Sequence, residues 1–91
     1  LPIDAVVDGL HNNTSLRSLL LWNCRFDEKA FEALGEALRN NKTLRRLNVG
    51  GNFGGSVGVA ALARSLVTSH VVGLNISLNG VKDDGMEEVA N

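Results

Sequence analysis

One spacing of apolar residues recurs three times along this chain and restricts its fold more than any other feature. Each occurrence has an apolar residue, two more apolar residues three and five positions later, and an Asn or Cys eight positions later. The three stretches are Leu16-x-x-Leu19-x-Leu21-x-x-Cys24, Leu44-x-x-Leu47-x-Val49-x-x-Asn52 and Val71-x-x-Leu74-x-Ile76-x-x-Asn79. They begin 28 and 27 residues apart. A period of this length predicts a solenoid of similar stacked coils.

The segments between these stretches carry small and apolar residues at helical spacing. Residues 27–38 and 55–66 correspond after a shift of 28 positions, so each coil is predicted to contain a strand followed by a helix. The matched positions are Ala30, Phe31, Leu34, Ala37 and Leu38 in the first segment and Gly58, Val59, Leu62, Ser65 and Leu66 in the second. The expected helix N-caps are Asp27, Ser56 and either Asp83 or Asp84.

With these repeats the chain resembles the leucine-rich repeat family, and within it the ribonuclease-inhibitor-like subclass. The resemblance is carried by TSLRSLLLWNC, ALRNNKTLRRLNVGGN and LNISLNGVKDDG, and it covers nearly the whole chain. It implies an α/β leucine-rich repeat solenoid, a horseshoe segment with parallel strands on the concave face and helices on the convex face. NOD-like receptors and the Ran GTPase-activating protein belong to the same subclass.

We expect residues 1–91 to form a single leucine-rich repeat domain of about three repeats. The pattern is cut inside a repeat at both ends, and neither end shows a polar cap. The chain is therefore predicted to be an excerpt of a longer array.

The residue that closes each strand is expected to connect neighbouring coils. Asn52 and Asn79 stand where the chain turns inward, and their side chains can bond buried backbone groups that would otherwise be unsatisfied. Cys24 would do this only weakly, through its thiol.

Two positions depart from the family pattern. Gly54 stands where Phe26 stands in the preceding coil, so the turn GGNFGGSVG is expected to be looser or to use Phe53 instead. The turn LVTSHV is one residue shorter than LRNNKTL, so Ser69 takes the place of Asn41 only approximately.

Strand alternation separates core residues from residues on the open concave face. Core positions are Leu19, Leu21, Leu47, Val49, Leu74 and Ile76. The residues between them, together with Gly50 and Gly73, face outward, and this face is the usual protein-binding surface in the family. The predicted partner-binding residues are Ser18, Leu20, Trp22, Arg46, Asn48, Asn75 and Ser77.

The position of Trp22 has two interpretations. An exposed Trp beside an exposed Leu20 forms an apolar spot of the kind that dominates protein interfaces, and Arg46 could add a charge. Alternatively, Trp22 folds over Gly50 of the next coil and only covers the backbone.

Composition and charge exclude several classes of protein. The formal net charge of -1 does not favour nucleic acid or an anionic membrane as a partner, although basic residues can still cluster locally. A single cysteine excludes an internal disulfide framework and favours a reducing, cytoplasmic location. The longest apolar runs are far shorter than a membrane helix requires.

The sequence predicts no catalytic, metal or cofactor site. His11 and His70 are isolated near expected helix ends, Cys24 has no activating base, and residues 50–55 lack a phosphate-loop pattern. A cluster of acids is expected to cap the last helix rather than to hold a cation. These acids are Asp83, Asp84, Glu87 and Glu88.

The predicted function is a non-catalytic protein-protein interaction module whose partner, of unknown identity, binds the concave face. The alternatives are a regulator of an enzyme partner, such as a GTPase activator, and a purely structural segment of a larger array. A ribonuclease inhibitor is disfavoured, because a basic enzyme would require an acidic concave face and this one carries Arg46. Self-association through the uncapped ends of the solenoid is a further alternative.

Overall fold

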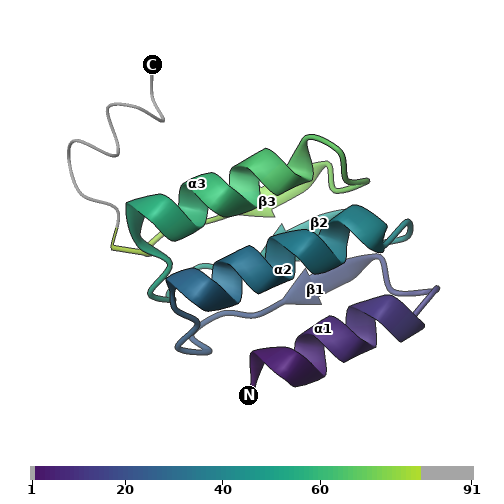
Figure 1. Ribbon diagram of the computed structural model, residues 1–91, viewed down its shortest axis with the longest axis horizontal. Coiled ribbons are helices and arrows are strands. Elements are labelled where there is room, and N and C mark those ends of the chain that lie inside the picture. The colour runs from purple at the N-terminus through teal and green to yellow at the C-terminus, as the bar shows by residue number, and fades with distance from the viewer. Residues whose placement is uncertain (1, 81–91) are drawn as a thin grey trace.

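The computed structural model describes residues 2–80, which form three helices and three strands in strict alternation. The helices form one layer and the strands lie behind them in a second layer (Figure 1). The elements in chain order are α1 (Ile3–Asn12), β1 (Ser18–Leu20), α2 (Glu28–Asn40), β2 (Arg46–Asn48), α3 (Gly55–Leu66) and β3 (Gly73–Asn75). This arrangement confirms the predicted α/β solenoid.

The strands form one parallel sheet in the order β1-β2-β3. Leu19 pairs with Leu47 and Leu47 with Leu74, which is the register that the 28- and 27-residue repeats predict. Backbone hydrogen bonds continue the pairing past the ends of β1 and β2. Leu21 N donates to Asn48 O at 2.7 Å, and Asn23 N donates to Gly50 O at 3.1 Å. The sheet is therefore effectively longer than its three-residue strands.

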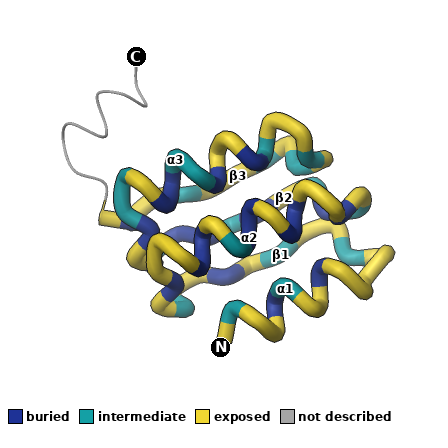
Figure 2. Tube along the Cα trace, viewed as in Figure 1, coloured by how far each residue is buried: buried dark blue, intermediate teal, exposed yellow. Residues whose placement is uncertain are grey.

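The hydrophobic core lies between the two layers, where the helix sides that face the sheet are buried (Figure 2). The predicted inward positions Leu21, Leu47 and Val49 are buried there. Leu74 shares their side of the sheet but is 37% exposed, because among residues 2–80 strand β3 has a neighbour on only one side. The outer helices are close enough that a Cβ at Gly35 on α2 would lie 2.9 Å from the Cβ of Ser65 on α3.

The side chain of Asn52 connects two coils, as predicted. Its Oδ1 accepts hydrogen bonds from the backbone N–H of Cys24 at 2.9 Å and of Phe26 at 3.0 Å. Its Nδ2 donates to the carbonyls of Leu21 and Val49, both at 2.8 Å, and to that of Gly50 at 3.2 Å. Asn52 is only 3% exposed, so these bonds satisfy backbone groups that water does not reach.

Asn79 repeats this arrangement one coil later. Its Nδ2 donates to the carbonyl of Val49 in the preceding coil and of Ile76 in its own, both at 2.9 Å. Cys24, by contrast, places its Sγ 3.6 Å from the carbonyl oxygen of Trp22 in its own coil. The hydrogen bond of the thiol therefore stays within its own coil, and the predicted weak connection to a neighbouring coil is wrong.

The turns before the strands use the same chemistry. Asn41 accepts from the N–H groups of Thr43 and Leu44 and donates to the carbonyl of Leu10 in the coil before at 2.9 Å. Ser69, its counterpart in the shorter turn, accepts from the N–H of Val71 at 3.2 Å. The approximate correspondence of Ser69 with Asn41 is confirmed.

One of the two predicted N-caps within residues 2–80 is correct. Asp27 accepts from the N–H of Ala30 at 2.9 Å and caps α2. Ser56, however, lies inside α3, which already begins at Gly55. Asn79 of the next coil replaces a local cap, because its Oδ1 accepts from Gly54 N at 3.1 Å and its carbonyl accepts from Gly55 N at 2.9 Å. Asp83 and Asp84 lie outside the described residues.

The gap left by Gly54 is filled from another coil. A Cβ at Gly54 would lie 2.7 Å from Cδ2 of Phe31, whose ring is fully buried. Phe53 is 65% exposed, so of the two expected alternatives, a looser turn or a site filled by Phe53, the second is wrong. The close packing of Phe31 on the Gly54 backbone leaves no room for a second aromatic ring.

Replacing Asn52 and Cys24, which occupy the same position in successive coils, measures what the asparagine contributes. Asn52→Ala should lower the free energy of unfolding by about 3 kcal/mol or more, because it leaves several buried backbone groups without a hydrogen-bond partner. Cys24→Ala should cost less than about 1 kcal/mol, since it removes a half-buried thiol with one weak contact. Urea unfolding followed by circular dichroism measures both, and equal losses would contradict the connecting role of Asn52.

Candidate functional site

Three rows of residues line the open face of the sheet, one residue from each coil in every row. The rows are Ser18, Arg46 and Gly73; Leu20, Asn48 and Asn75; and Trp22, Gly50 and Ser77. All seven predicted partner-binding residues therefore lie on one surface, as strand alternation requires. We call it the concave face.

Trp22 lies against the backbone of the next coil. A Cβ at Gly50 would overlap its ring, lying 2.6 Å from Cε3, and a Cβ at Gly51 would lie 3.1 Å from Cε2. The glycines thus form a flat seat for one face of the indole, which explains why Gly50 is buried on an otherwise open surface. Trp22 nevertheless remains 49% exposed, and Leu20 beside it is 73% exposed.

Arg46 is seated in a similar way in the next pair of coils. A Cβ at Gly73 would lie 3.5 Å from Cγ of Arg46, so the stem of the arginine passes over the glycine. The stem gains apolar contact there while the charged end reaches water. In both cases a large side chain is supported by a glycine one coil further along.

The polar residues of the middle row are partly engaged with their own coil. Asn48 Oδ1 accepts from Gly50 N at 2.9 Å, and Asn75 Oδ1 accepts from Ser77 N at 2.9 Å and from its Oγ at 2.7 Å. These bonds fix the two amide groups above the strand ends. A shallow groove of about 380 Å³ runs over the strands beside them, between Leu20 and Arg46.

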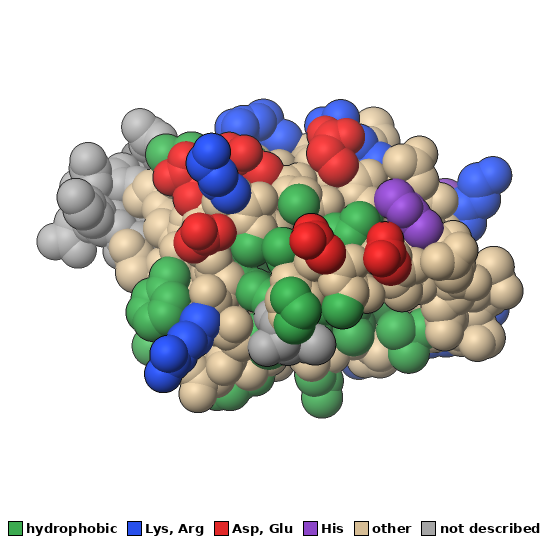
Figure 3. Space-filling view, turned by 60° about the horizontal axis from the view of Figure 1, so that its bottom comes forward, with side chains coloured by type: hydrophobic (Ala, Val, Ile, Leu, Met, Phe, Trp, Pro, Cys, Tyr) green, Lys and Arg blue, Asp and Glu red, His purple; other side chains and the backbone are tan. Residues whose placement is uncertain are grey.

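Charge is divided between the two layers. Every acidic residue among residues 2–80 lies on a helix or is the N-cap Asp27, and Figure 3 shows acidic side chains over the helical part of one face. Lys29, Arg39 and Arg64 are on the helices too. The other lysines and arginines of residues 2–80 lie on β2 or in the loops that flank β1 and β2, and they are Arg17, Arg25, Lys42, Arg45 and Arg46.

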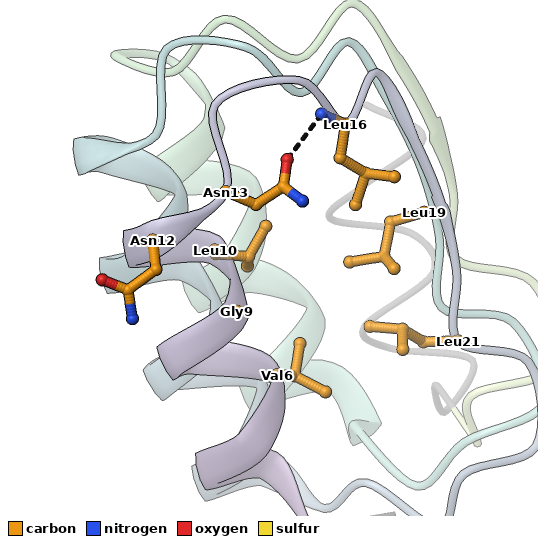
Figure 4. A pocket seen from close by; sticks show the side chains of 8 residues that line it. All are labelled: Val6, Gly9, Leu10, Asn12, Asn13, Leu16, Leu19 and Leu21. Carbon is orange, nitrogen blue, oxygen red and sulfur yellow. Dashed lines mark hydrogen bonds between the residues drawn. The ribbon is translucent and has the colours of Figure 1, made fainter.

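An apolar cleft of about 410 Å³ lies at the end of the stack formed by α1 and β1. Val6 and Leu10 reach into it from α1, and Leu16, Leu19 and Leu21 reach into it from the opposite side (Figure 4). The repeat pattern predicts an end without a polar cap but does not indicate a cleft. The spacing of Leu10, Asn13 and Leu16 could have indicated the cleft, since it places α1 and the turn that follows it against the core.

The two histidines of the described range lie at exposed positions near the ends of helices. His11 is exposed in the last turn of α1, and His70 is exposed in the loop after α3 rather than on the helix. No group of three His, Cys, Asp or Glu side chains within residues 2–80 could hold a metal ion. The acids Asp84, Glu87 and Glu88 lie outside this range.

None of the helices in the described range is long and apolar enough to cross a lipid bilayer.

Comparisons with known proteins agree with this geometry. A family model described as "Leucine Rich repeat" matches residues 40–63 and 69–90. The chain is 32% identical over 82 residues to the mouse (Mus musculus) "NACHT, LRR and PYD domains-containing protein 4C", covering 88% of this chain and 8% of that protein. The chain therefore spans less than a tenth of the length of this relative.

Among solved structures, "Leiomodin-1 Actin-Binding Site 2 (ABS2)" is similar with a TM-score of 0.82 and 24% identity. The match covers 99% of this chain and 56% of the leiomodin chain. At this identity the likeness establishes the fold.

Alanine at Gly50 and at Gly73 should have opposite outcomes. Gly50→Ala must displace the indole, so the emission of Trp22, the only tryptophan, should shift to the red and stability should fall by about 1 kcal/mol. Gly73→Ala meets Arg46 at ordinary contact distance and should be neutral or slightly stabilising. Fluorescence and urea unfolding check both, and an unshifted emission in Gly50→Ala would contradict the seat described for Trp22.

Proposed function

Because the chain belongs to the leucine-rich repeat family, we propose that it is a non-catalytic protein-interaction module. The partner binds the concave face, where seven residues are presented in three rows. The contact residues are Ser18, Leu20, Trp22, Arg46, Asn48, Asn75 and Ser77.

The observation that carries this proposal is the state of Trp22, which is seated on Gly50 and Gly51 and yet half-exposed. A side chain held in this way loses little conformational entropy when a partner covers it. Leu20 adds exposed apolar area next to it, and seated aromatic residues of this kind are the usual centres of interface energy.

The relatives support a protein partner. The leiomodin-1 segment with the same fold is named as an actin-binding site, so that protein uses such a solenoid to bind another protein. For this chain we propose only that the solenoid binds a protein, and we do not propose that this protein is actin. Two further points belong to the same proposal. A ribonuclease-inhibitor-like subclass is suggested by the full α-helix that follows each of β1 and β2, and a cytoplasmic location is suggested by the single Cys24.

One observation favours a second function, a structural segment of a larger array. The packing of Trp22 on Gly50 stabilises the contact between two coils whether or not a partner binds. The mouse relative is far longer than this chain, and the apolar cleft beside α1 is the kind of surface that another coil covers. Under this alternative, Trp22 would affect stability alone.

A pull-down with the protein that carries this chain tests the proposal. The double variant Trp22→Ala with Arg46→Ala should reduce recovery of one specific partner at least about tenfold, because it removes the seated aromatic and the cation. The matched control is Phe53→Ala with Arg64→Ala, which removes an exposed aromatic and an arginine outside the concave face. That variant should retain the partner.

Two results would contradict binding at the concave face. One is equal recovery of every partner by both double variants. The other is unchanged recovery combined with a loss of more than about 2 kcal/mol of stability in Trp22→Ala, which would establish the structural function instead.

A further inference from the structure

We infer that the segment bound by the concave face is acidic: an extended peptide segment rich in Asp and Glu that also carries one apolar anchor residue. This inference rests on the proposed function and specifies the chemistry of the partner. The net charge of -1 conceals how charge is divided between the helical layer and the strand layer.

Three arginines form a basic cluster where β1 and β2 begin. Arg17, Arg45 and Arg46 belong to adjacent coils, and the carbonyl of Arg17 accepts from the N–H of Arg45 at 2.8 Å and of Arg46 at 3.0 Å. The three backbones are thus in direct contact. Lys42 lies in the loop that leads to the same strand start.

The side chains of this cluster are held in place. Arg17 Nη1 donates to the carbonyl of Thr43 at 3.2 Å, Arg45 Nη1 donates to that of Lys42 at 3.0 Å, and the stem of Arg46 lies over Gly73. A guanidinium group has five N–H donors, so these backbone bonds leave others for a carboxylate. The cluster is therefore ordered before any partner arrives.

No acid neutralises the cluster within residues 2–80. The ion pair found there joins Arg39 and Glu36, both on α2, at 3.2 Å. Like-charged groups close together disfavour a basic partner and attract an acidic one. The charge complementarity therefore selects carboxylates.

The apolar part of the face indicates a polypeptide rather than a nucleic acid. Trp22 and Leu20 are exposed on the same surface as Arg46, whereas Arg17 and Arg45 directly precede the strands of that surface. An apolar side chain of a peptide is the natural occupant for Trp22 and Leu20. The rows of Arg46 and Trp22 are separated by four residues along the strands, or about 13 Å at ~3.3 Å per residue. The matching ligand is an extended segment with a carboxylate about four residues from a Leu or Phe.

The single tryptophan makes a direct test available with the full chain. The probe is a synthetic peptide of about twelve residues, rich in Glu, with one central Leu, and its matched counterpart has every Glu replaced by Lys. The acidic peptide should change Trp22 emission saturably, and its dissociation constant should rise at least about fivefold between about 50 and 300 mM NaCl. The lysine peptide should bind at least about tenfold more weakly.

A pair of glutamine variants locates the binding. Arg46→Gln retains much of the stem over Gly73 but removes the charge, so the dissociation constant of the acidic peptide should rise about three- to tenfold. Arg64→Gln makes the same chemical change on α3 and should alter the constant less than about twofold. Equal effects of the two variants would overturn the assignment to the basic cluster.

The outcomes separate this inference from the proposed function. If the lysine peptide binds as tightly as the acidic one and Trp22 responds, the face binds protein but the acidic preference is wrong. If no peptide alters Trp22 while the pull-down partner still depends on Trp22 and Arg46, the acidic preference is again wrong and the proposed function stands. A single-stranded oligonucleotide of about twelve nucleotides that binds tighter than the acidic peptide would overturn the assignment to a polypeptide.

Discussion

The buried amide of Asn52 contacts five backbone groups from two coils, and the remainder of the solenoid depends on this contact. A parallel strand leaves its sheet through a turn whose N–H and C=O groups point into the stack, away from water. Without the amide these groups would be buried and unpaired, at a cost of about 1–3 kcal/mol each. Asn79 uses the same carbonyl of Val49 that Asn52 uses, so neighbouring coils share an acceptor and their turns are fixed relative to each other.

Most of the fold could be predicted because its causes are local and repeat along the chain. Apolar spacing determined the strands, the register and the inward positions, and Asn at a fixed place determined the turns. The errors occurred where a residue of another coil replaces a local one. Ser56 is a suitable cap by type, but Asn79 bonds the start of α3, and Phe31 rather than Phe53 covers Gly54. Contacts across coils of this kind have no signature in a single segment.

The candidate site was predictable in part for the same reason. Alternation placed Trp22, Leu20 and Arg46 on one face, since it requires only the strand register. It could not give the exposure of Trp22, which depends on Gly50 and Gly51 of the next coil. The absence of acids from the strand layer within residues 2–80 was also hidden, because a formal net charge sums over both layers.

The small residues on the outer layer have a consequence for the shape of the stack. Strands in a sheet lie about 4.8 Å apart, whereas packed helices lie about 8–10 Å apart, so each coil is a wedge that bends the solenoid toward its strands. Where Gly35 meets Ser65, the helices approach closely and the wedge is thinner. The bend between the coils that contain β1 and β2 is thus controlled from the convex side. A larger residue at position 35 would push the two helices apart and curl the array more tightly toward its strands.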